Sequence, residues 1–244
     1  MEKSAMATQM PSLPGEAVAQ YHEMGYVVVE NFLDPAAAHD WKETLKARLT
    51  AEGKINEPSG VRVWMADGMD PLTRAQVTSA KTTAILQQLI GPNVEFLSVK
   101  AVFKNGTTTF PSPWHQDWFY WQGSAKLSIW IALDDATPEN GCLRLVPGSH
   151  REHFTPRNID DGHGFGLRIT DEDIGNRPIV TVPVSRGSAV IFHDLALHSS
   201  CPNVNGQDRW SVISTYRDGG VKDESTVWQR GVVMSGVSVN DHAD

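Results

Sequence analysis

The sequence has few cysteines and no long apolar run, and both absences limit the classes of protein it can encode. Only two cysteines, Cys142 and Cys201, occur among 244 residues, so a disulfide scaffold is excluded. Both are expected to be free thiols in a reducing compartment. No stretch approaches the ~18 consecutive apolar residues of a membrane-spanning helix, and the first residues hold no apolar signal-peptide segment. We therefore expect a soluble protein without a membrane partner, with the cytoplasm as the default compartment.

Positive charge is also scarce. The 21 lysines and arginines are outnumbered by 29 acidic residues, which gives a net charge of −8, and no basic run stands out. A nucleic-acid partner is therefore not expected, and a small-molecule substrate fits better than a polyanion. With 40% hydrophobic residues the chain can bury a sizeable core. We expect one domain over residues 15–244, preceded by a flexible arm at residues 1–14 that contains Pro11 and Pro14.

Helix signals are concentrated in the first ninety residues. Asp34-Pro35 is a strong helix start, because Asp can cap the first turn and Pro is tolerated at the first helical position. A strand, YVVVENF, is expected after the first helix ends at Gly25. The predicted helices are residues 16–24, the stretch from Asp34-Pro35 to Gly53, and roughly residues 71–90.

Strand signals dominate from Val94 onward. The segments are short, rich in β-branched and aromatic residues, and separated by turn residues such as Asn105-Gly106 and Asn205-Gly206. They are VEFLSVKAVF, AKLSIWIALDD, CLRLV, PIVTVPV, SAVIF, WSVISTY and TVWQRGVV. Early helices and late strands predict a mainly β fold with N-terminal helices packed on one side, and a double-sheet jelly roll is the leading candidate.

Two segments carry residues that could hold a metal ion. In PSPWHQDWFYW, an extended backbone would point His115 and Asp117 toward the same face. A second histidine could come from FHDLALHSS, which offers His193 and His198. Two histidines and one carboxylate form the facial triad of non-haem Fe(II) oxygenases, which leaves coordination sites open. A His-x-Asp pair is common by chance, however, and the chain has nine histidines.

An arginine follows the second histidine segment and strengthens the metal hypothesis. Ser200 comes first, then CPNVNGQD, whose Pro-Asn and Asn-Gly pairs predict a turn, and then Arg209 at the start of RWSVISTY. A hairpin would place Arg209 beside the strand end that carries His198. A guanidinium there suits a carboxylate gripped at two points, although a lone arginine is more often a surface residue.

Taken in order, these segments resemble the phytanoyl-CoA dioxygenase family of Fe(II)/2-oxoglutarate-dependent oxygenases, which includes phytanoyl-CoA hydroxylase and ectoine hydroxylase. The resemblance covers roughly residues 20 to 218, and the eleven residues from His198 to Arg209 match the family spacing. The matching stretches are His115-Gln116-Asp117, IWIALDDATPENGCLRLVPGSH, GSAVIFHDLALHSS, the Pro-Asn pair and Arg209-Trp210.

The resemblance implies a double-stranded β-helix that uses Fe(II) and 2-oxoglutarate, with ascorbate as a reductant. It assigns iron and catalysis to three residues and co-substrate binding to others. The implied iron ligands are His115, Asp117 and His198. The implied co-substrate residues are Arg209, which pairs with the distal carboxylate, Ser200, Trp130 and Lys100, while Arg62 matches a basic residue of the N-terminal part.

The expected substrate is a small organic molecule, polycyclic or aromatic. An acyl-CoA is not favoured, because the sequence shows no peroxisomal address. Trp114 and the run Trp118–Trp121 surround the metal motif, and alternate members of the run are expected to form a flat apolar wall. That wall predicts a natural-product tailoring enzyme, as in antibiotic biosynthesis, and Asp117 argues against halogenation, which in related enzymes needs a small residue there.

One segment and two other functions remain open. The irregular stretch from His153 to Asn176 is a predicted lid, in which His163 is the residue most able to reach a ligand. A zinc hydrolase could use the same three ligands with a bound water, but it has no use for Arg209 at this spacing. A non-catalytic binding or sensor protein could keep the metal as a structural staple. The sequence identifies neither the substrate, the outcome of oxidation (hydroxylation, cyclisation, epimerisation or desaturation), nor the oligomeric state.

Overall fold

The computed structural model describes residues 12–56, 60–66, 68–159, 166–228 and 230–240. The helices are α1 (Gly15–Met24), α2 (Pro35–Ala51), α3 (Pro71–Val77), α4 (Ala80–Ile90), α5 (Trp118–Trp121), the 3-10 turn η1 (Ser149–Arg151) and α6 (Asp171–Ile174). The strands are β1 (Tyr26–Val29), β2 (Val61–Met65), β3 (Val94–Lys104), β4 (Lys126–Ala132), β5 (Leu143–Leu145), β6 (Arg157–Asn158), β7 (Leu167–Arg168), β8 (Val180–Val182), β9 (Ala189–His193), β10 (His198–Ser200), β11 (Arg209–Asp218) and β12 (Val232–Val233). No helix in these ranges is long and apolar enough to cross a membrane.

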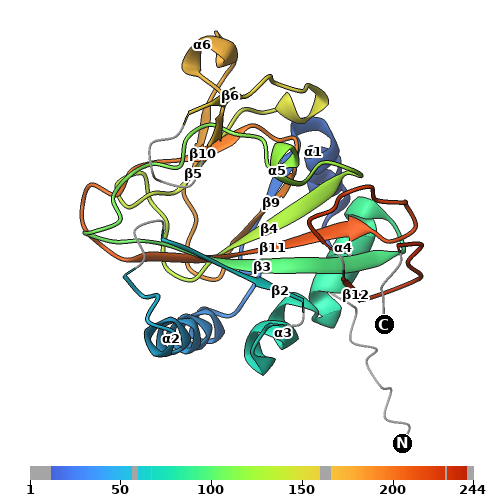
Figure 1. Cartoon of the computed structure of the whole chain (residues 1–244), viewed down its shortest axis with the longest axis horizontal. Helices are drawn as coiled ribbons and strands as arrows, with labels where there is room; N and C mark the ends of the chain where they lie inside the picture. Colours follow the sequence, from blue (N-terminus) through green and yellow to red (C-terminus); the bar gives the residue numbers. More distant parts are fainter. Residues whose placement is uncertain (1–11, 57–59, 67, 160–165, 229, 241–244) are drawn as a thin grey trace, which may run out of the picture.

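Two antiparallel sheets form the body of the protein (Figure 1). The larger sheet has the order β1-β9-β4-β11-β3-β12, and β2 also pairs with β3. The smaller sheet has the order β10-β5-β8, and β6 pairs with β7 as a separate ribbon. Between them lies a cluster of buried residues from both sheets, including Trp130 and Phe192 from the larger sheet and Leu145 from the smaller one. This is the predicted jelly roll, and the mainly β fold is confirmed.

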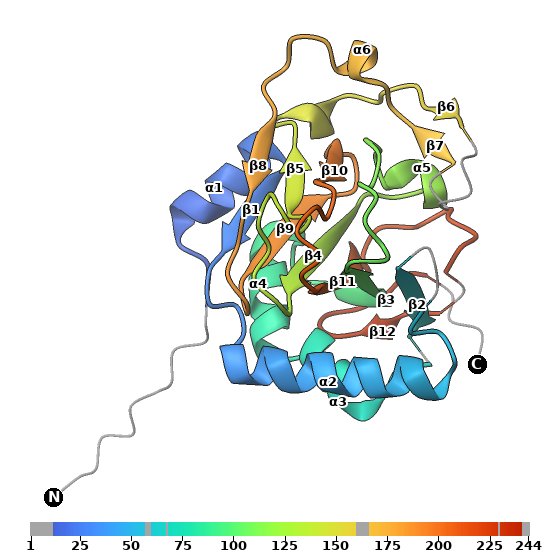
Figure 2. The ribbon, with the colours of Figure 1, turned by 90° about the vertical axis from the view of Figure 1, so that its left-hand side faces the viewer.

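The N-terminal helices cover the outer face of the larger sheet, as predicted (Figure 2). The Asp34 carboxylate accepts hydrogen bonds from the N–H groups of Ala36 and Ala37, so it caps α2 as its position before Pro35 predicts. Trp41, Leu45 and Leu49 are fully buried along one face of α2 and belong to the same core cluster as the sheet residues beneath them. The outer face of the larger sheet is therefore covered by a continuous apolar layer.

Three expectations about individual segments need correction. The predicted helix at about 71–90 is two helices, because the Ser79 hydroxyl accepts from Thr82 N–H and begins α4 anew. The strand predicted over TVWQRGVV is limited to Val232–Val233 in the described residues. Of the predicted arm at residues 1–14, residues 1–11 lie outside the described residues, but Leu13 is buried and exchanges two backbone hydrogen bonds with the Gln88 side chain.

Candidate functional site

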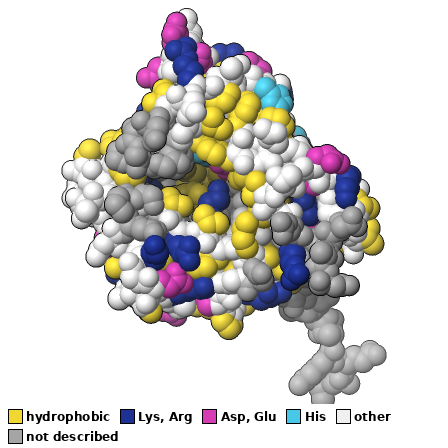
Figure 3. Space-filling view, in the orientation of Figure 1, with side chains coloured by type: hydrophobic (Ala, Val, Ile, Leu, Met, Phe, Trp, Pro, Cys, Tyr) yellow, Lys and Arg dark blue, Asp and Glu magenta, His cyan; other side chains and the backbone are white. Residues whose placement is uncertain are grey.

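A cavity of about 380 Å³ lies between the two sheets and is lined mostly by apolar and aromatic side chains. It opens on the face shown in Figure 3, where hydrophobic side chains surround a hollow. A volume of this size suits a small ligand, since pockets for such ligands range over ~300–1,000 Å³. The polar and charged residues along its wall are Ser98, Lys100, Ser112, His115, Asp117, His198, Ser199, Ser200 and Arg209.

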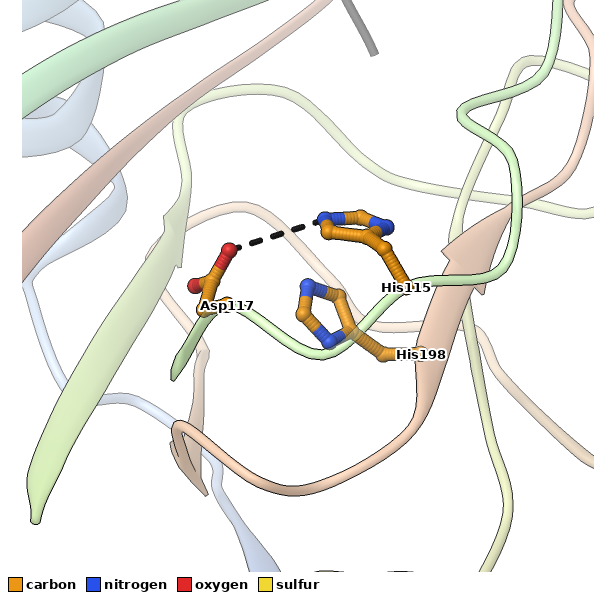
Figure 4. A group of neighbouring side chains, drawn as sticks. All are labelled: His115, Asp117 and His198. Carbon is orange, nitrogen blue, oxygen red and sulfur yellow. Dashed lines mark ion pairs between the residues drawn. The ribbon is translucent and has the colours of Figure 1, made fainter. Parts of the chain in front are cut away.

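His115, Asp117 and His198 converge inside this cavity (Figure 4). All three are buried, and their ligand atoms lie within 4.8 Å of one another. His115 and His198 are directly opposite each other, because their backbones exchange hydrogen bonds of 3.0 and 3.1 Å. The Nε2 atom of His115 lies 3.6 Å from Oδ1 of Asp117. One ion could therefore contact all three side chains.

The backbone sets the tautomer of both histidines. Nδ1 of His115 lies 2.8 Å from the carbonyl oxygen of Pro113, and Nδ1 of His198 lies 2.9 Å from that of Ala196. A carbonyl oxygen can only accept, so each Nδ1 carries the hydrogen and each neutral ring keeps its lone pair on Nε2. Metal-binding histidines are oriented in this way by an acceptor behind the ring.

The charge states also suit a metal ion. Burial and the neighbouring His115 lower the pKa of His198 to about 4, so its ring is neutral at pH 7. Burial alone would raise the pKa of Asp117, but Lys100, His115 and His198 together hold it well below its usual range. Asp117 is therefore ionised, and neither group must lose a proton when a metal binds at neutral pH.

The lowered pKa of His198 predicts a pH dependence of the metal-free protein. The unfolded chain takes up a proton near pH 6.5, whereas the folded chain does so only near pH 4, so stability falls as the pH drops between these values. The loss is on the order of 3 kcal/mol. Urea unfolding of metal-free wild type and His198→Ala at pH 7 and pH 4 measures this. Equal losses in both proteins would show that His198 is not the group responsible.

The local structure around Asp117 differs from the extended segment expected from the sequence. Asp117 has helical backbone angles and precedes α5, so Trp118–Trp121 forms a helical turn. The expected alternation of this run is therefore wrong. Tyr120 and Trp121 line the cavity, whereas Trp118 and Phe119 contact the ring of His153.

Arg209 reaches the cavity from the opposite sheet. The predicted hairpin is wrong, because β10 pairs with β5 whereas β11 pairs with β3 and β4. The connecting loop crosses between the sheets and places Arg209 at the start of β11. The arginine lines the same cavity as the three clustered residues, and its guanidinium carbon lies 5.6 Å from the centre of the Trp130 ring.

The guanidinium of Arg209 is buried and has no acidic partner within ion-pair distance in the part of the chain that the structure describes. Arg209 is 2% exposed, its Nη1 donates to the Ser211 hydroxyl at 2.7 Å, and its Nε atom has no hydrogen-bond partner among the described residues. Burial lowers its pKa to about 10, so it still carries a charge at pH 7. Asp134, an acid that partly counters this shift, is itself ion-paired with Lys42 and Arg186. A buried, uncompensated cation is costly and favours an anionic ligand.

The remaining residues singled out from the sequence divide into two groups. Ser200, Trp130 and Lys100 line the cavity. The Ser200 hydroxyl accepts from Ser112 N–H at 2.9 Å, and the Lys100 ammonium lies 5.2 Å from the centre of the Trp121 ring.

Arg62 and His193 lie elsewhere. Arg62 forms an ion pair with Glu52 at 3.1 Å and does not line the cavity. Nδ1 of His193 accepts from Leu195 N–H at 3.0 Å, and its ring packs near that of His150. His193 is not part of the three-residue cluster.

Sequence reasoning missed two parts of the cavity wall. Val61, Val63 and Met65 of β2 line it. These three alternate along β2 with Arg62 and Trp64, and the short apolar run VRVWM was the signal available for a strand. Trp228 also lines the cavity, from a segment that the sequence predicted as a strand without relating it to the site.

The described part of the predicted lid contains the strand pair β6–β7 and the short helix α6. β6 and β7 pair, and the Tyr120 hydroxyl donates to the Leu167 carbonyl at 3.1 Å, which joins this strand pair to the cavity wall. Residues 160–165, including His163, lie outside the described residues, so the lid remains a prediction.

The fold and the cluster define a class: a double-stranded β-helix with two histidines and a carboxylate inside its cavity. The chain belongs to the phytanoyl-CoA dioxygenase (PhyH) family, whose model matches residues 21–211. The resemblance found in the sequence is thereby confirmed.

Two curated relatives each match more than half of the chain. The zebrafish (Danio rerio) phytanoyl-CoA dioxygenase domain-containing protein 1 is 30% identical over 167 residues, 65% of this chain and 56% of that protein. A probable alpha-ketoglutarate-dependent hypophosphite dioxygenase of Stutzerimonas stutzeri is 30% identical over 145 residues, 56% of this chain and 48% of that protein. The chain thus spans about half the length of the curated relatives it matches.

Solved structures show the same fold over most of the chain. The epimerase SnoN, in complex with Fe3+, alpha ketoglutarate and nogalamycin RO, is 25% identical with a TM-score of 0.68 and covers 84% of this chain and 83% of its own. The alpha ketoglutarate-dependent carbocyclase SnoK from nogalamycin biosynthesis is also 25% identical, with a TM-score of 0.69 and 85% of each chain covered.

Proposed function

We propose that this protein is an Fe(II)- and 2-oxoglutarate-dependent oxygenase that oxidises an unactivated C–H bond of a small organic substrate. The observation that carries the proposal is the buried guanidinium of Arg209. It has no acidic partner within ion-pair distance among the described residues and lines the same cavity as the buried cluster of His115, Asp117 and His198. Three side chains able to bind one metal ion, together with an unneutralised arginine, fit a co-substrate that chelates the metal at one end and carries a carboxylate at the other.

The residues of the cluster fit iron. His115 and His198 would present Nε2, and Asp117 one carboxylate oxygen, which is the set of ligands typical of non-haem Fe(II) oxygenases. Three protein ligands leave coordination positions for 2-oxoglutarate and O₂. When bound, the iron would couple oxidative decarboxylation of 2-oxoglutarate to substrate oxidation, with ascorbate available to keep it reduced.

The far end of the cavity fits the distal carboxylate of 2-oxoglutarate. Arg209 would pair with it through a charge-assisted hydrogen bond, and Ser200 would donate its hydroxyl hydrogen. Trp130 forms the flat wall beneath the guanidinium. Lys100 stands nearer Asp117, whose pKa it lowers, so it would act on the metal end of the co-substrate.

The substrate end of the cavity is apolar and aromatic. Val63, Met65, Tyr120, Trp121 and Trp228 line it, which suits a polycyclic or aromatic molecule. SnoN and SnoK, which share this fold, are from nogalamycin biosynthesis. A tailoring role in secondary metabolism follows, with hydroxylation, cyclisation, epimerisation or desaturation as the outcome at carbon.

The hydrolase and sensor alternatives differ from the oxygenase in a simple assay. With Fe(II), 2-oxoglutarate and O₂, we expect the protein to convert 2-oxoglutarate to succinate, faster when a suitable polycyclic substrate is added. Zn(II) in place of Fe(II) should give no succinate. If the protein binds 2-oxoglutarate but forms no succinate with any of a panel of ring-bearing compounds, the non-catalytic sensor protein is favoured. Hydrolysis supported by Zn(II) would favour the hydrolase.

A further inference from the structure

The two cysteines of the chain lie directly opposite each other. In the β10–β5 pair, His198 faces Leu145 and Ser200 faces Leu143, so the next step in register places Cys201 opposite Cys142. The backbone confirms this step, because Cys201 N–H donates to the Cys142 carbonyl at 2.9 Å. Opposite residues of a hydrogen-bonded antiparallel pair have Cα atoms ~5.5 Å apart. That separation falls inside the ~4.4–6.8 Å range that a disulfide spans.

The thiols also interact with each other. Burial, the charge of Cys201 and a hydrogen bond with its thiol raise the pKa of Cys142 to about 12. Cys142 is fully buried, whereas Cys201 is partly exposed. An oxidant from solvent would therefore reach Cys201 first. Cys142 would then be the neighbouring thiol that reacts with the oxidised Cys201 sulfur.

A buried lysine, Lys104, lies near Cys201, the partly exposed member of the pair. Burial and the nearby Arg209 lower the pKa of Lys104 to about 7, while Cys201 acts in the opposite direction. The Lys104 amine itself donates to the carbonyl oxygen of Phe110. A cation near a thiol favours the thiolate form that reacts with peroxide.

We propose that Cys142 and Cys201 form a redox-sensitive pair that closes to an intrachain disulfide in the presence of hydrogen peroxide and thereby weakens co-substrate binding. The Cys201 sulfur attacks one peroxide oxygen, the O–O bond breaks, and the thiol proton leaves with the other oxygen as water. The Cys142 sulfur then attacks the resulting sulfenic acid, the S–O bond breaks, and a second water leaves with the Cys142 proton. Two thiols are oxidised and one peroxide is reduced to two waters.

The pair is connected to the predicted 2-oxoglutarate site on both sides. Cys201 directly follows Ser200, and the Cys142 thiol is close enough to Arg209 to affect its pKa. Forming the ~2.05 Å S–S bond turns both sulfurs toward each other and removes the Cys142 thiol from the surroundings of Arg209, which alters the carboxylate-binding end of the cavity next to Ser200. This second half of the inference rests on the proposed function, whereas disulfide formation itself does not.

The test of the disulfide uses the full chain, reduced, freed of metal with a chelator and then exposed to a small excess of hydrogen peroxide. We expect the count of free thiols under denaturing conditions to fall from two to none and the intact mass to fall by two hydrogens. Dithiothreitol should restore both. Cys201→Ser and Cys142→Ala should each retain their remaining thiol or gain oxygen, without losing two hydrogens. Unchanged thiols, a gain of oxygen in wild type, or a disulfide between two chains would overturn the inference.

The effect of the disulfide on 2-oxoglutarate binding is measured separately. The readout is the rise in melting temperature that 2-oxoglutarate causes, with Mn(II) in place of iron. The oxidised protein should need about tenfold more 2-oxoglutarate than the reduced protein, which is the loss of roughly one hydrogen bond to a charged group. Cys201→Ser should respond like reduced wild type before and after peroxide. If the disulfide forms and the 2-oxoglutarate requirement is unchanged, the regulatory half is wrong. If neither form responds to 2-oxoglutarate, the proposed function fails while the thiol result stands.

Discussion

Replacing His198 with alanine is expected to remove iron and to abolish turnover, whereas replacing His193 is expected to preserve both. His198 supplies one of three ligand atoms that lie within 4.8 Å of one another. The loss of a ligand should weaken iron binding by more than the ~10–100-fold that follows the loss of a hydrogen-bonding partner behind a ligand. His193 lies only five positions earlier, but its ring stands outside the cluster.

Metal analysis after reconstitution with Fe(II) measures the difference between the two histidine variants. His193→Ala is the matched control, because it removes the same side chain from the same segment. Circular dichroism and thermal unfolding verify that both variants fold. If His198→Ala retained full iron and His193→Ala lost it, the assignment of the third ligand would be wrong.

Replacing Arg209 with methionine is expected to raise the concentration of 2-oxoglutarate needed for half-maximal turnover by on the order of 30-fold to several thousand-fold. The variant removes a buried charge from its anionic ligand, which costs about 2–5 kcal/mol. Methionine keeps much of the side-chain length and packing over Trp130. Arg209→Lys should fall between wild type and Arg209→Met, because an ammonium keeps the charge and loses the two-point grip.

Iron content should hardly change in either Arg209 variant, since the arginine is not one of the three clustered metal-binding residues. Arg186→Met serves as the control, because Arg186 is a partly exposed arginine that pairs with Asp134 outside the cavity. Wild-type dependence on 2-oxoglutarate in Arg209→Met would contradict the assigned role of the guanidinium.

Much of the fold could be predicted because its signals are local. The cap at Asp34, the apolar spacing of Trp41 and Leu45, and the short strands after Val94 each follow from a few neighbouring residues. The candidate site was predictable for a different reason. The ordered set from His115 to Arg209 matched a family pattern, so it did not depend on knowing the path of the chain between them.

The errors arose where tertiary contacts decide the conformation. Asp117 turns into α5 because Trp118 N–H donates to the carbonyl of Asp194 and Trp121 Nε1–H donates to its carboxylate, and no pattern in the sequence reveals these partners. The Asn-Gly turn before Arg209 predicted a hairpin, but the loop crosses to the other sheet. A turn signal shows where the chain bends and leaves open which strand it joins next.

The most direct measurement of the central claim is the fate of ¹⁸O₂ in the presence of Fe(II), 2-oxoglutarate and a substrate that accelerates turnover. A 2-oxoglutarate-dependent oxygenase places one atom of O₂ in succinate, while the other enters a hydroxylated product or leaves as water. The account therefore predicts that each succinate formed carries one ¹⁸O atom in its new carboxylate, and that His198→Ala forms no labelled succinate. Succinate without label, or product formation that continues without O₂, would contradict it.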